Sequence, residues 1–243
     1  MATTLVPARE SADVESSSED YARRFAGPVG AFFLDVQARA TLQALAPWPR
    51  ARVLDVGGGH AQNVGPLVEA GYDLTVYGSA ASCAERVRPW LERGQASFAS
   101  GDLLALDFPD GSFDVAVCYR LLPHVERWSA LLVELARVAR RAVLVDYPTR
   151  RSVNAVAEAF FGLKRGIEGN TRPYTVFHDR QIEDALRGQG LRTSGRWPQF
   201  FFPMALHRAL RMAPLSRGLE ALAASLGLRR LLGSPVILRA ERG

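Results

Sequence analysis

The sequence contains few of the residues that build disulfide frameworks, metal centres or membrane spans. Only two cysteines, Cys83 and Cys118, occur among 243 residues, which excludes a disulfide-stabilised scaffold and a four-thiolate zinc site. The four histidines and the acidic residues show no metal-ligand spacing, so no metal is expected. No apolar run reaches the roughly 18 residues of a membrane span, and the acidic N-terminal stretch is unlike a signal peptide. These absences predict a cytoplasmic protein.

Lysine is also scarce, because Lys164 is the only lysine among the 30 basic residues. The charge is divided unevenly: residues 1–125 carry 10 basic and 15 acidic side chains, whereas residues 126–243 carry 20 and 10. An arginine-rich C-terminal half is typical of a protein that meets an anionic substrate, a nucleic acid or a membrane surface. A GC-rich genome would also produce this preference for arginine.

Short apolar segments alternate with amphipathic segments along most of the chain, which predicts an α/β fold. The expected strands are residues 52–56, 74–77, 96–99, 113–118, 142–145, 191–197 and 234–240. The expected helices between them are residues 63–70, 80–92, 128–139, 153–161 and 178–189. Apolar strands that alternate with helices imply a doubly wound, mostly parallel, seven-stranded sheet that is covered on both faces.

The chain is expected to fold as one domain with two helical additions. Residues 1–18 are rich in serine and acids and predict a disordered tail. Residues 19–46 predict an N-terminal helical cap, and residues 47–243 the main domain. Within that domain, leucines at helical spacing in residues 199–233 predict a helical insertion between the last two strands, which we interpret as a lid. We expect His207 on a solvated basic face of the insertion and residues 200–202 at the entrance of the pocket.

The clearest motif is a strand that runs directly into three glycines, Val53-Leu54-Asp55-Val56-Gly57-Gly58-Gly59. Such a turn brings backbone N–H groups close to a ligand at the carboxyl edge of the sheet. A dinucleotide site would prefer glycine at position 62, where Gln62 stands, and no Lys-Ser or Lys-Thr pair follows the glycines. The motif therefore indicates a nucleotide-type ligand that is neither a dinucleotide nor a nucleoside triphosphate.

The glycine motif resembles the first motif of class I S-adenosylmethionine-dependent methyltransferases. The similarity continues over residues 50–150 and more loosely to the end, with residues 101–115, 120–125 and 175–190 at the family's expected places. The resemblance implies a Rossmann-like fold, S-adenosyl-L-methionine as cofactor, and methyl transfer as the reaction.

The resemblance also implies where the cofactor binds. Asp102 would accept a hydrogen bond from the adenine amino group, with the Leu103 backbone beside the ring, and Arg24 would reach the methionine carboxylate. The family's second strand ends in an acid that binds both ribose hydroxyls, but Gly78 stands at that place and Ser79 follows it. The expected cofactor-binding residues are Arg24, Asp55, Gly57, Gly58, Gly59, Gly78, Ser79, Asp102, Leu103 and Tyr119.

The methyl acceptor is less constrained by the sequence. His124, which follows the fourth strand, is the candidate general base, and a packing role is its alternative. The segment Cys118-Tyr119-Arg120-Leu121 is unlike the Asn-Pro-Pro-Tyr segment of amine methyltransferases, which favours transfer to oxygen or carbon. The expected acceptor-binding residues are Tyr21, Arg172, Tyr174 and Phe201.

We therefore expect S-adenosylmethionine-dependent methylation of a small, anionic or amphipathic metabolite. One alternative is an RNA methyltransferase that uses the same arginine-rich surface, and another is a non-catalytic binding protein with a degenerate ribose site. No DNA partner is expected. The 199–233 insertion is a candidate for a peripheral membrane contact or a homodimer contact.

Overall fold

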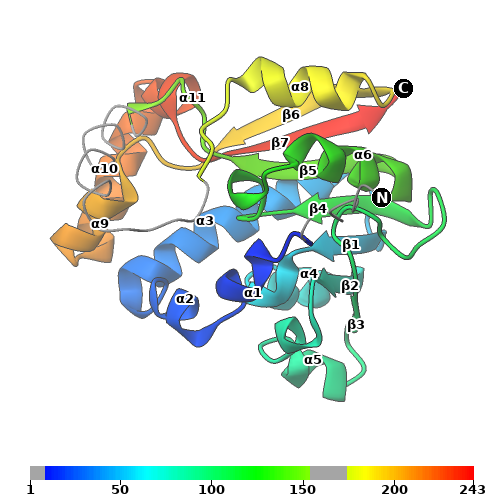
Figure 1. The fold of residues 1–243 in the computed structure, drawn as a ribbon. Helices are drawn as coiled ribbons and strands as arrows, with labels where there is room; N and C mark the ends of the chain where they lie inside the picture. Colours follow the sequence, from blue (N-terminus) through cyan, green and yellow to red (C-terminus); the bar gives the residue numbers. More distant parts are fainter. Residues whose placement is uncertain (1–8, 154–173) are drawn as a thin grey trace, which may run out of the picture.

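The computed structural model describes residues 9–153 and 174–243 (Figure 1). A seven-stranded sheet has the strand order β3-β2-β1-β4-β5-β7-β6, in which β7 runs antiparallel to both β5 and β6. This arrangement confirms the predicted fold class. The strands are β1 (Arg52–Val56), β2 (Asp73–Gly78), β3 (Ser97–Ser100), β4 (Phe113–Cys118), β5 (Ala139–Tyr147), β6 (Leu191–Pro198) and β7 (Val236–Arg242).

Helices cover both faces of the sheet, because successive strand residues point to opposite sides and both sets are apolar. Helices α6 (Trp128–Val138) and α8 (Asp179–Arg187) pack on one face, where Leu54 and Val143 are buried. Helices α3 (Gly27–Leu45) and α4 (Val64–Glu69) pack on the other, against Val53 and Leu144. Figure 1 shows these two layers on either side of the strands.

The helix expected after β2 is divided into two short pieces. A 3₁₀ turn, η2 (Ala81–Ala84), is followed by α5 (Arg88–Glu92). Pro89 lies in the first turn of α5, where a missing backbone N–H costs nothing, whereas the interior of one continuous helix would lose a hydrogen bond there. Two further 3₁₀ turns, η1 (Gly58–His60) and η3 (Leu122–His124), follow β1 and β4.

The expected disordered tail is wrong for the end of residues 1–18. Residues Ala12–Ser16 form helix α1, and α2 (Glu19–Arg23) follows it directly. The serines that suggested disorder instead stabilise these helices: Ser17 Oγ donates a hydrogen bond to the Asp13 carbonyl, and Ser18 Oγ accepts one from Tyr21 N–H. Asp13 is fully buried. Residues 12–23 are therefore part of the folded domain.

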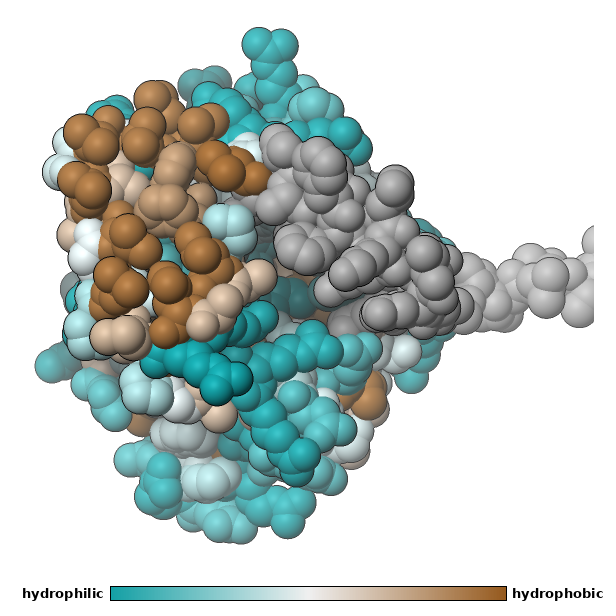
Figure 2. Space-filling model, turned by 90° about the vertical axis from the view of Figure 1, so that its left-hand side faces the viewer, coloured by the Kyte–Doolittle hydropathy of each residue, from teal (hydrophilic) through white to brown (hydrophobic). Residues whose placement is uncertain are grey.

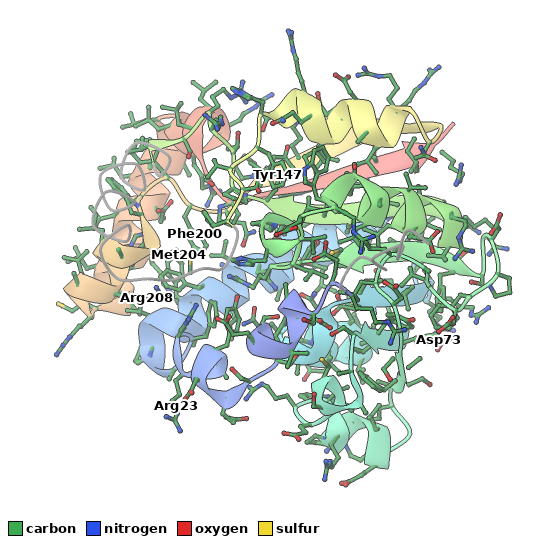
Figure 3. The ribbon with its side chains drawn as sticks, in the orientation of Figure 1. Arg23, Asp73, Tyr147, Phe200, Met204 and Arg208 are labelled. Atoms are coloured by element: carbon green, nitrogen blue, oxygen red, sulfur yellow. The ribbon has the colours of Figure 1, made fainter. Side chains whose placement is uncertain are left out.

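The insertion between β6 and β7 forms three helices at the left of Figure 1: α9 (Met204–Leu210), α10 (Ala213–Ser225) and α11 (Leu228–Leu232). It packs on α3 through a cluster of buried aromatic rings that includes Phe32, Phe33 and Phe200. Figure 3 shows Phe200, Met204 and Arg208 together beside α3. Phe200 is fully buried, so the expectation that it lies at the pocket entrance is wrong.

The insertion buries a polar pair of side chains and exposes several leucines. His207, which was expected on a solvated basic face, is fully buried, and its Nε2 lies 3.0 Å from Glu220 Oε1. Leu222 and Leu226, two of the leucines at helical spacing, are 58% and 64% exposed. The reason is that Glu220 also accepts the backbone N–H groups of Phe201 and Phe202, so the polar side of α10 anchors the insertion.

Two further expectations concern the helix predicted over residues 153–161 and the absence of a membrane span. The helix predicted over residues 153–161 lies outside the described residues except at its first position. Among the described residues, no helix combines the length and the apolar character that crossing a membrane would require.

Candidate cofactor and acceptor site

The glycine turn after β1 approaches its neighbours so closely that side chains are excluded. Gly57 has φ of +75°, a conformation that glycine adopts without strain, and its N–H donates to the Tyr77 carbonyl at 2.8 Å. A Cβ at Gly58 would overlap the Asp55 carboxylate, and one at Gly59 would overlap Ser17 Oγ of the segment after α1. The turn therefore fits a site where a ligand contacts backbone.

The Asp55 carboxylate packs against Gly58 of this turn and is fully buried. Its Oδ2 accepts a hydrogen bond from Asn63 Nδ2 at 3.2 Å, whereas its Oδ1 has no partner among the described residues. Burial raises the pKa of Asp55 to about 7, the Asn63 hydrogen bond acts to lower it, and the nearby Asp146 carboxylate raises it further. The carboxyl is thus poised to change protonation near neutral pH.

Asn63 belongs to a chain of polar contacts that crosses from β1 to β5. Gln37 Nε2 of α3 donates to Asn63 Oδ1 at 3.0 Å, and Gln37 Oε1 accepts Arg120 Nη2 at 2.6 Å. The Arg120 backbone N–H donates to Asp146 Oδ1, also at 2.6 Å. The guanidinium carbon of Arg120 lies 4.5 Å from the ring centroid of Phe25. Arg120 therefore connects the strand ends with the N-terminal cap.

Asp102 and Leu103 follow β3, as expected. Asp102 Oδ1 accepts the Leu104 N–H at 2.9 Å, and Asp102 Oδ2 lies 4.0 Å from Arg9 Nε in an exposed ion pair. One carboxylate oxygen thus holds the loop, while the other faces a weak surface partner that a ligand amine would replace. Leu103 is fully buried.

The end of β2 holds a carboxylate that comes from elsewhere in the chain. Gly78 has no side chain, and Asp73, at the other end of β2, lies far from the insertion (Figure 3). Asp13 of α1 reaches this place: its Oδ2 accepts the Ser79 backbone N–H at 2.7 Å, and its Oδ1 accepts Ser79 Oγ–H at 2.5 Å. Both the backbone N–H and the hydroxyl of Ser79 therefore donate to Asp13.

Three other expected residues lie in the cap and beneath it. Tyr21 is buried, with its ring 5.6 Å from that of Phe25, and the Arg24 guanidinium lies 5.2 Å from the Tyr21 ring centroid. Tyr119 is fully buried against α3, where its hydroxyl accepts Thr41 Oγ–H at 3.3 Å. A contact between Tyr119 and a cofactor would thus come from its backbone.

The expected acceptor residues are partly brought together. The His124 ring lies 5.5 Å from the exposed Tyr174 ring. Phe201 is half-buried at the start of the insertion, with its ring 4.9 Å from Phe202. Arg172 lies outside the described residues. The structure thus places the candidate base beside one of the expected acceptor-binding rings.

Three arginines from three elements converge between the cap and the insertion. Arg208 of α9 has its guanidinium carbon 5.9 Å from the Phe33 ring centroid, and its Nη2 donates to the Arg24 carbonyl at 3.4 Å. Partial burial lowers the pKa of Arg208, and the positive charges of Arg120 and Arg24 lower it further. The Arg24 guanidinium also lies 3.7 Å from Glu15 Oε1. An anion beside Arg208 would be stabilised by its charge and by the field of Arg120 and Arg24.

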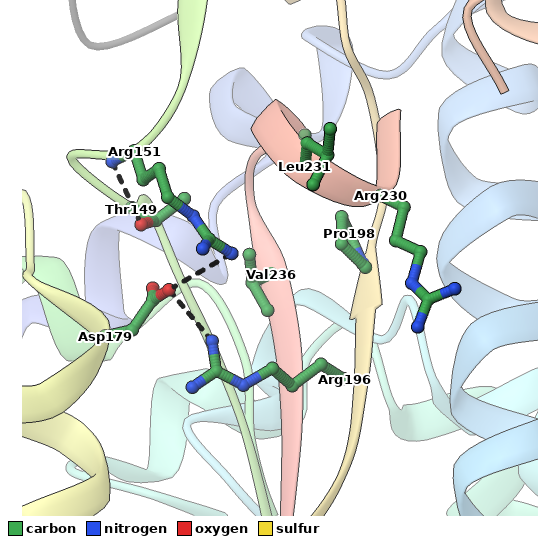
Figure 4. Close-up of a pocket in the computed structure, with 9 residues that line it drawn as sticks. Thr149, Arg151, Asp179, Arg196, Pro198, Arg230, Leu231 and Val236 are labelled. Atoms are coloured by element: carbon green, nitrogen blue, oxygen red, sulfur yellow. Dashed lines mark hydrogen bonds and ion pairs between the residues drawn. The ribbon is translucent and has the colours of Figure 1, made fainter. Parts of the chain in front are cut away.

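A cavity of about 380 Å³ lies at the end of β5 and next to α11 (Figure 4). Asp179 in its wall pairs with Arg196 at 2.8 Å and with Arg151 at 3.8 Å. None of the expected cofactor- or acceptor-binding residues lines it. We therefore place the candidate site at the glycine turn and the arginine cluster, because these carry the ligand-binding chemistry.

Comparisons with known proteins agree with this geometry. Residues 54–145 match the family model described as a methyltransferase domain. A demethylmenaquinone methyltransferase from Beutenbergia cavernae is 30% identical over 225 residues, which cover 83% of this chain and 92% of that protein. The chain belongs to the class I S-adenosylmethionine-dependent methyltransferases.

Solved structures share the fold of this chain. Magnesium protoporphyrin IX methyltransferase from Synechocystis PCC 6803, with bound S-adenosylhomocysteine, has a TM-score of 0.65 at 18% identity and covers 92% of this chain and 93% of that one. A second similar structure is the complex between the Haloferax volcanii Trm112 methyltransferase activator and the putative methyltransferase. It has a TM-score of 0.63 at 17% identity, and the match covers 94% of this chain and 96% of that one. The methyltransferase thus uses S-adenosylmethionine as its cofactor, and it is an enzyme rather than a non-catalytic binding protein.

The residues of this methyltransferase fit that cofactor. The side-chain-free turn offers backbone N–H groups, and carboxylates lie at the ends of β2 and β3. Sequence reasoning missed Asp13, Gln37, Arg120 and Asp146. Arg120, two residues after β4, and Asp146, near the end of β5, carried a signal through their place at the carboxyl edge of the sheet. Asp13 and Gln37 depend on how distant elements meet.

Proposed function

We propose that this methyltransferase transfers a methyl group from S-adenosylmethionine to an oxygen or carbon atom of a small, anionic or amphipathic metabolite. The observation that carries this proposal is the convergence of Arg24, Arg120 and Arg208 beside aromatic rings. The guanidinium groups would bind an acidic group, and the rings would contact an apolar body.

The cofactor would lie across Gly57, Gly58 and Gly59, with its adenine at Asp102 and Leu103. Asp55 would stabilise the turn, and Arg24 or Arg120 would pair with the methionine carboxylate. The sulfonium group already makes the methyl carbon electrophilic, so the protein's task is to align the acceptor and exclude water. His124 would remove the acceptor's proton, and Tyr174 and Phe201 would bind its apolar part.

The relatives favour a small acceptor over RNA. The B. cavernae protein is named for demethylmenaquinone and the Synechocystis protein for magnesium protoporphyrin IX. Transfer of label from methyl-labelled S-adenosylmethionine to a metabolite extract tests this. We expect label in small molecules that an anion exchanger retains. Label only in RNA would favour the alternative enzyme, and label in neutral or cationic metabolites would contradict the role of the arginines.

We also propose that the outer face of the insertion contacts an anionic membrane surface. Figure 2 shows a brown, hydrophobic area on the face of the molecule where the insertion lies. Six large apolar side chains of the insertion are exposed: Leu206, Met212, Leu215, Leu222, Leu226 and Leu231. Arg211, Arg217 and Arg230 are exposed on the same three helices, whereas Glu220, the only acid of residues 204–232, is buried. Apolar side chains together with uncompensated arginines fit an anionic lipid surface.

Vesicle sedimentation tests this contact. The parent should bind vesicles that contain phosphatidylglycerol more tightly than phosphatidylcholine vesicles. The double variant Leu222→Ser, Leu226→Ser should lose binding, whereas Val133→Ser, which alters a 41%-exposed valine on α6, should keep it. A homodimer that the double variant dissociates, with no vesicle binding by the parent, would assign the face to a second copy instead.

A further inference from the structure

The end of β2 is short of one acidic side chain, and α1 provides a carboxylate at the same place. Asp13 Oδ2 lies 3.4 Å from the position that a Cβ on Gly78 would occupy. The carboxylate is held by the N–H and hydroxyl of Ser79, and Cys83 Sγ lies 3.5 Å from Oδ2. Asp13 is 0% exposed, which is rare for a carboxylate and requires partners that replace water.

Gly78 and Asp13 are sterically complementary. A Cβ on Gly78 would lie 2.6 Å from the Cβ of Cys83, closer than packing allows. An aspartate at position 78 would therefore have to displace Cys83 and would crowd the Asp13 carboxylate. The glycine at position 78 thus leaves room for Cys83, whose thiol donates to the Asp13 carboxylate.

The same segment also contacts the glycine turn. Ser17 Oγ, which donates to the Asp13 carbonyl, lies against Gly59. Asp13 is thereby fixed between the end of β2 and the turn after β1, the two places between which a nucleoside is held in sheets of this kind. A ribose offers two vicinal hydroxyl donors, and a carboxylate has about four acceptor positions. Ser79 takes two of those of Asp13, and the Cys83 thiol, a weak donor, takes a third.

We propose that Asp13 replaces the missing acid of β2 and accepts hydrogen bonds from the ribose hydroxyls of the cofactor. This inference rests on the cofactor position proposed above. It makes the N-terminal helix a part of the cofactor site, although neither its distance in sequence nor its serine- and acid-rich composition indicates this.

Calorimetric titration with S-adenosylhomocysteine tests the inference without acceptor or turnover. Asp13→Ala should weaken binding by about 10- to 100-fold, the loss expected for hydrogen bonds to a charged group. Asp13→Asn, which keeps one acceptor oxygen and the same shape, should lose less. Asp20→Asn is the matched control, because Asp20 lies in the adjacent helix with its side chain 87% exposed, and it should bind like the parent.

A second ligand separates contact with ribose from a merely structural role. The 2′,3′-dideoxy analogue of S-adenosylhomocysteine lacks both hydroxyls, so Asp13→Ala should bind it about as well as the parent does. Equal losses for both ligands would mean that Asp13 only anchors α1. Tighter binding of S-adenosylhomocysteine by Asp13→Ala would mean that the carboxylate blocks the site.

Asp102→Ala distinguishes failure of this inference from failure of the cofactor position. If Asp102→Ala weakens S-adenosylhomocysteine binding and Asp13→Ala does not, the position stands and the inference is wrong. If neither variant weakens binding, both are wrong.

Discussion

Asp55 is a carboxyl group whose ionisation the folded protein opposes, and this has a measurable effect on stability. Its pKa is raised from 3.8 to about 7, chiefly by burial. Between about pH 4 and pH 7 the unfolded chain releases a proton that the folded protein retains, so stability falls as the pH rises through this range and then levels off.

Asp55→Asn should therefore stabilise the unliganded protein, and more at pH 8 than at pH 5. Asparagine has no proton to lose and can still accept the Asn63 hydrogen bond. The raised pKa of Asp55 implies that the free energy of unfolding gained by the substitution is larger at pH 8 than at pH 5 by an amount of order 3 kcal/mol. Urea unfolding of parent and variant at each pH measures it. A stability difference that is the same at pH 5 and pH 8 would contradict the assigned pKa.

Arg208 provides a test of acceptor recognition at a single side chain. If its guanidinium binds the anionic group of the acceptor, Arg208→Gln should raise the KM of that acceptor by roughly tenfold. The affinity for S-adenosylhomocysteine should not change. Arg211→Gln, at the exposed end of α9, is the control. A KM that is equal in both variants would remove Arg208 from the acceptor site.

Site residues could be predicted when their partners are close to them in the sequence, and not when their partners are distant in the sequence. Gly57 and Asp102 were predicted because the strand, the turn and the acid are adjacent in sequence. Asp13 was not predicted, because its partner Ser79 lies 66 residues away and only the folded chain brings them together. Gln37 was missed for the same reason, since it contacts Asn63 and Arg120 from the side of α3.

At the scale of elements, the strands were predicted more accurately than the packing of the insertion. Buried parallel strands are apolar throughout, so β4 was predicted with its observed ends. Helical spacing predicted that residues 199–233 are helical, but it does not say which side of a helix faces inward. The buried pair His207 and Glu220 decided that side, and no periodicity reveals such a pair.

Glu220 should be essential to the insertion. Its carboxylate accepts hydrogen bonds from two backbone N–H groups and lies against His207, so Glu220→Ala would leave buried donors without partners, at a cost of about 1–3 kcal/mol each. We expect faster hydrogen exchange in residues 200–232 and lower acceptor turnover, with unchanged S-adenosylhomocysteine binding.

Glu69→Gln, at the end of α4, is the control for this variant. Unchanged turnover despite faster exchange would show that the insertion does not cover the acceptor. Loss of cofactor binding would show that the insertion supports the cofactor site as well.

At the scale of the whole molecule, the uneven charge predicts how salt acts on the reaction. The formal net charge is +5, and the C-terminal half holds 20 of the 30 basic residues. Such a field attracts an anionic acceptor and is screened over about 10 Å at 0.1 M salt. Between 20 and 500 mM salt (roughly the range over which screening becomes complete), kcat/KM should fall severalfold. A kcat/KM that is independent of salt would argue for a neutral acceptor.

The position of Asp13 on a five-residue helix has a thermodynamic consequence. A carboxylate carried by a central strand is held by the whole sheet, whereas one carried by α1 is present only while α1 is docked. If Asp13 binds the ribose, the full affinity for the cofactor is available only to molecules in which α1 is docked. The apparent affinity therefore falls in proportion to the fraction of molecules in which α1 is docked. Any condition that loosens the first twenty residues, such as heat, a protease cut or a fused tag, would then weaken cofactor binding while the sheet stays intact.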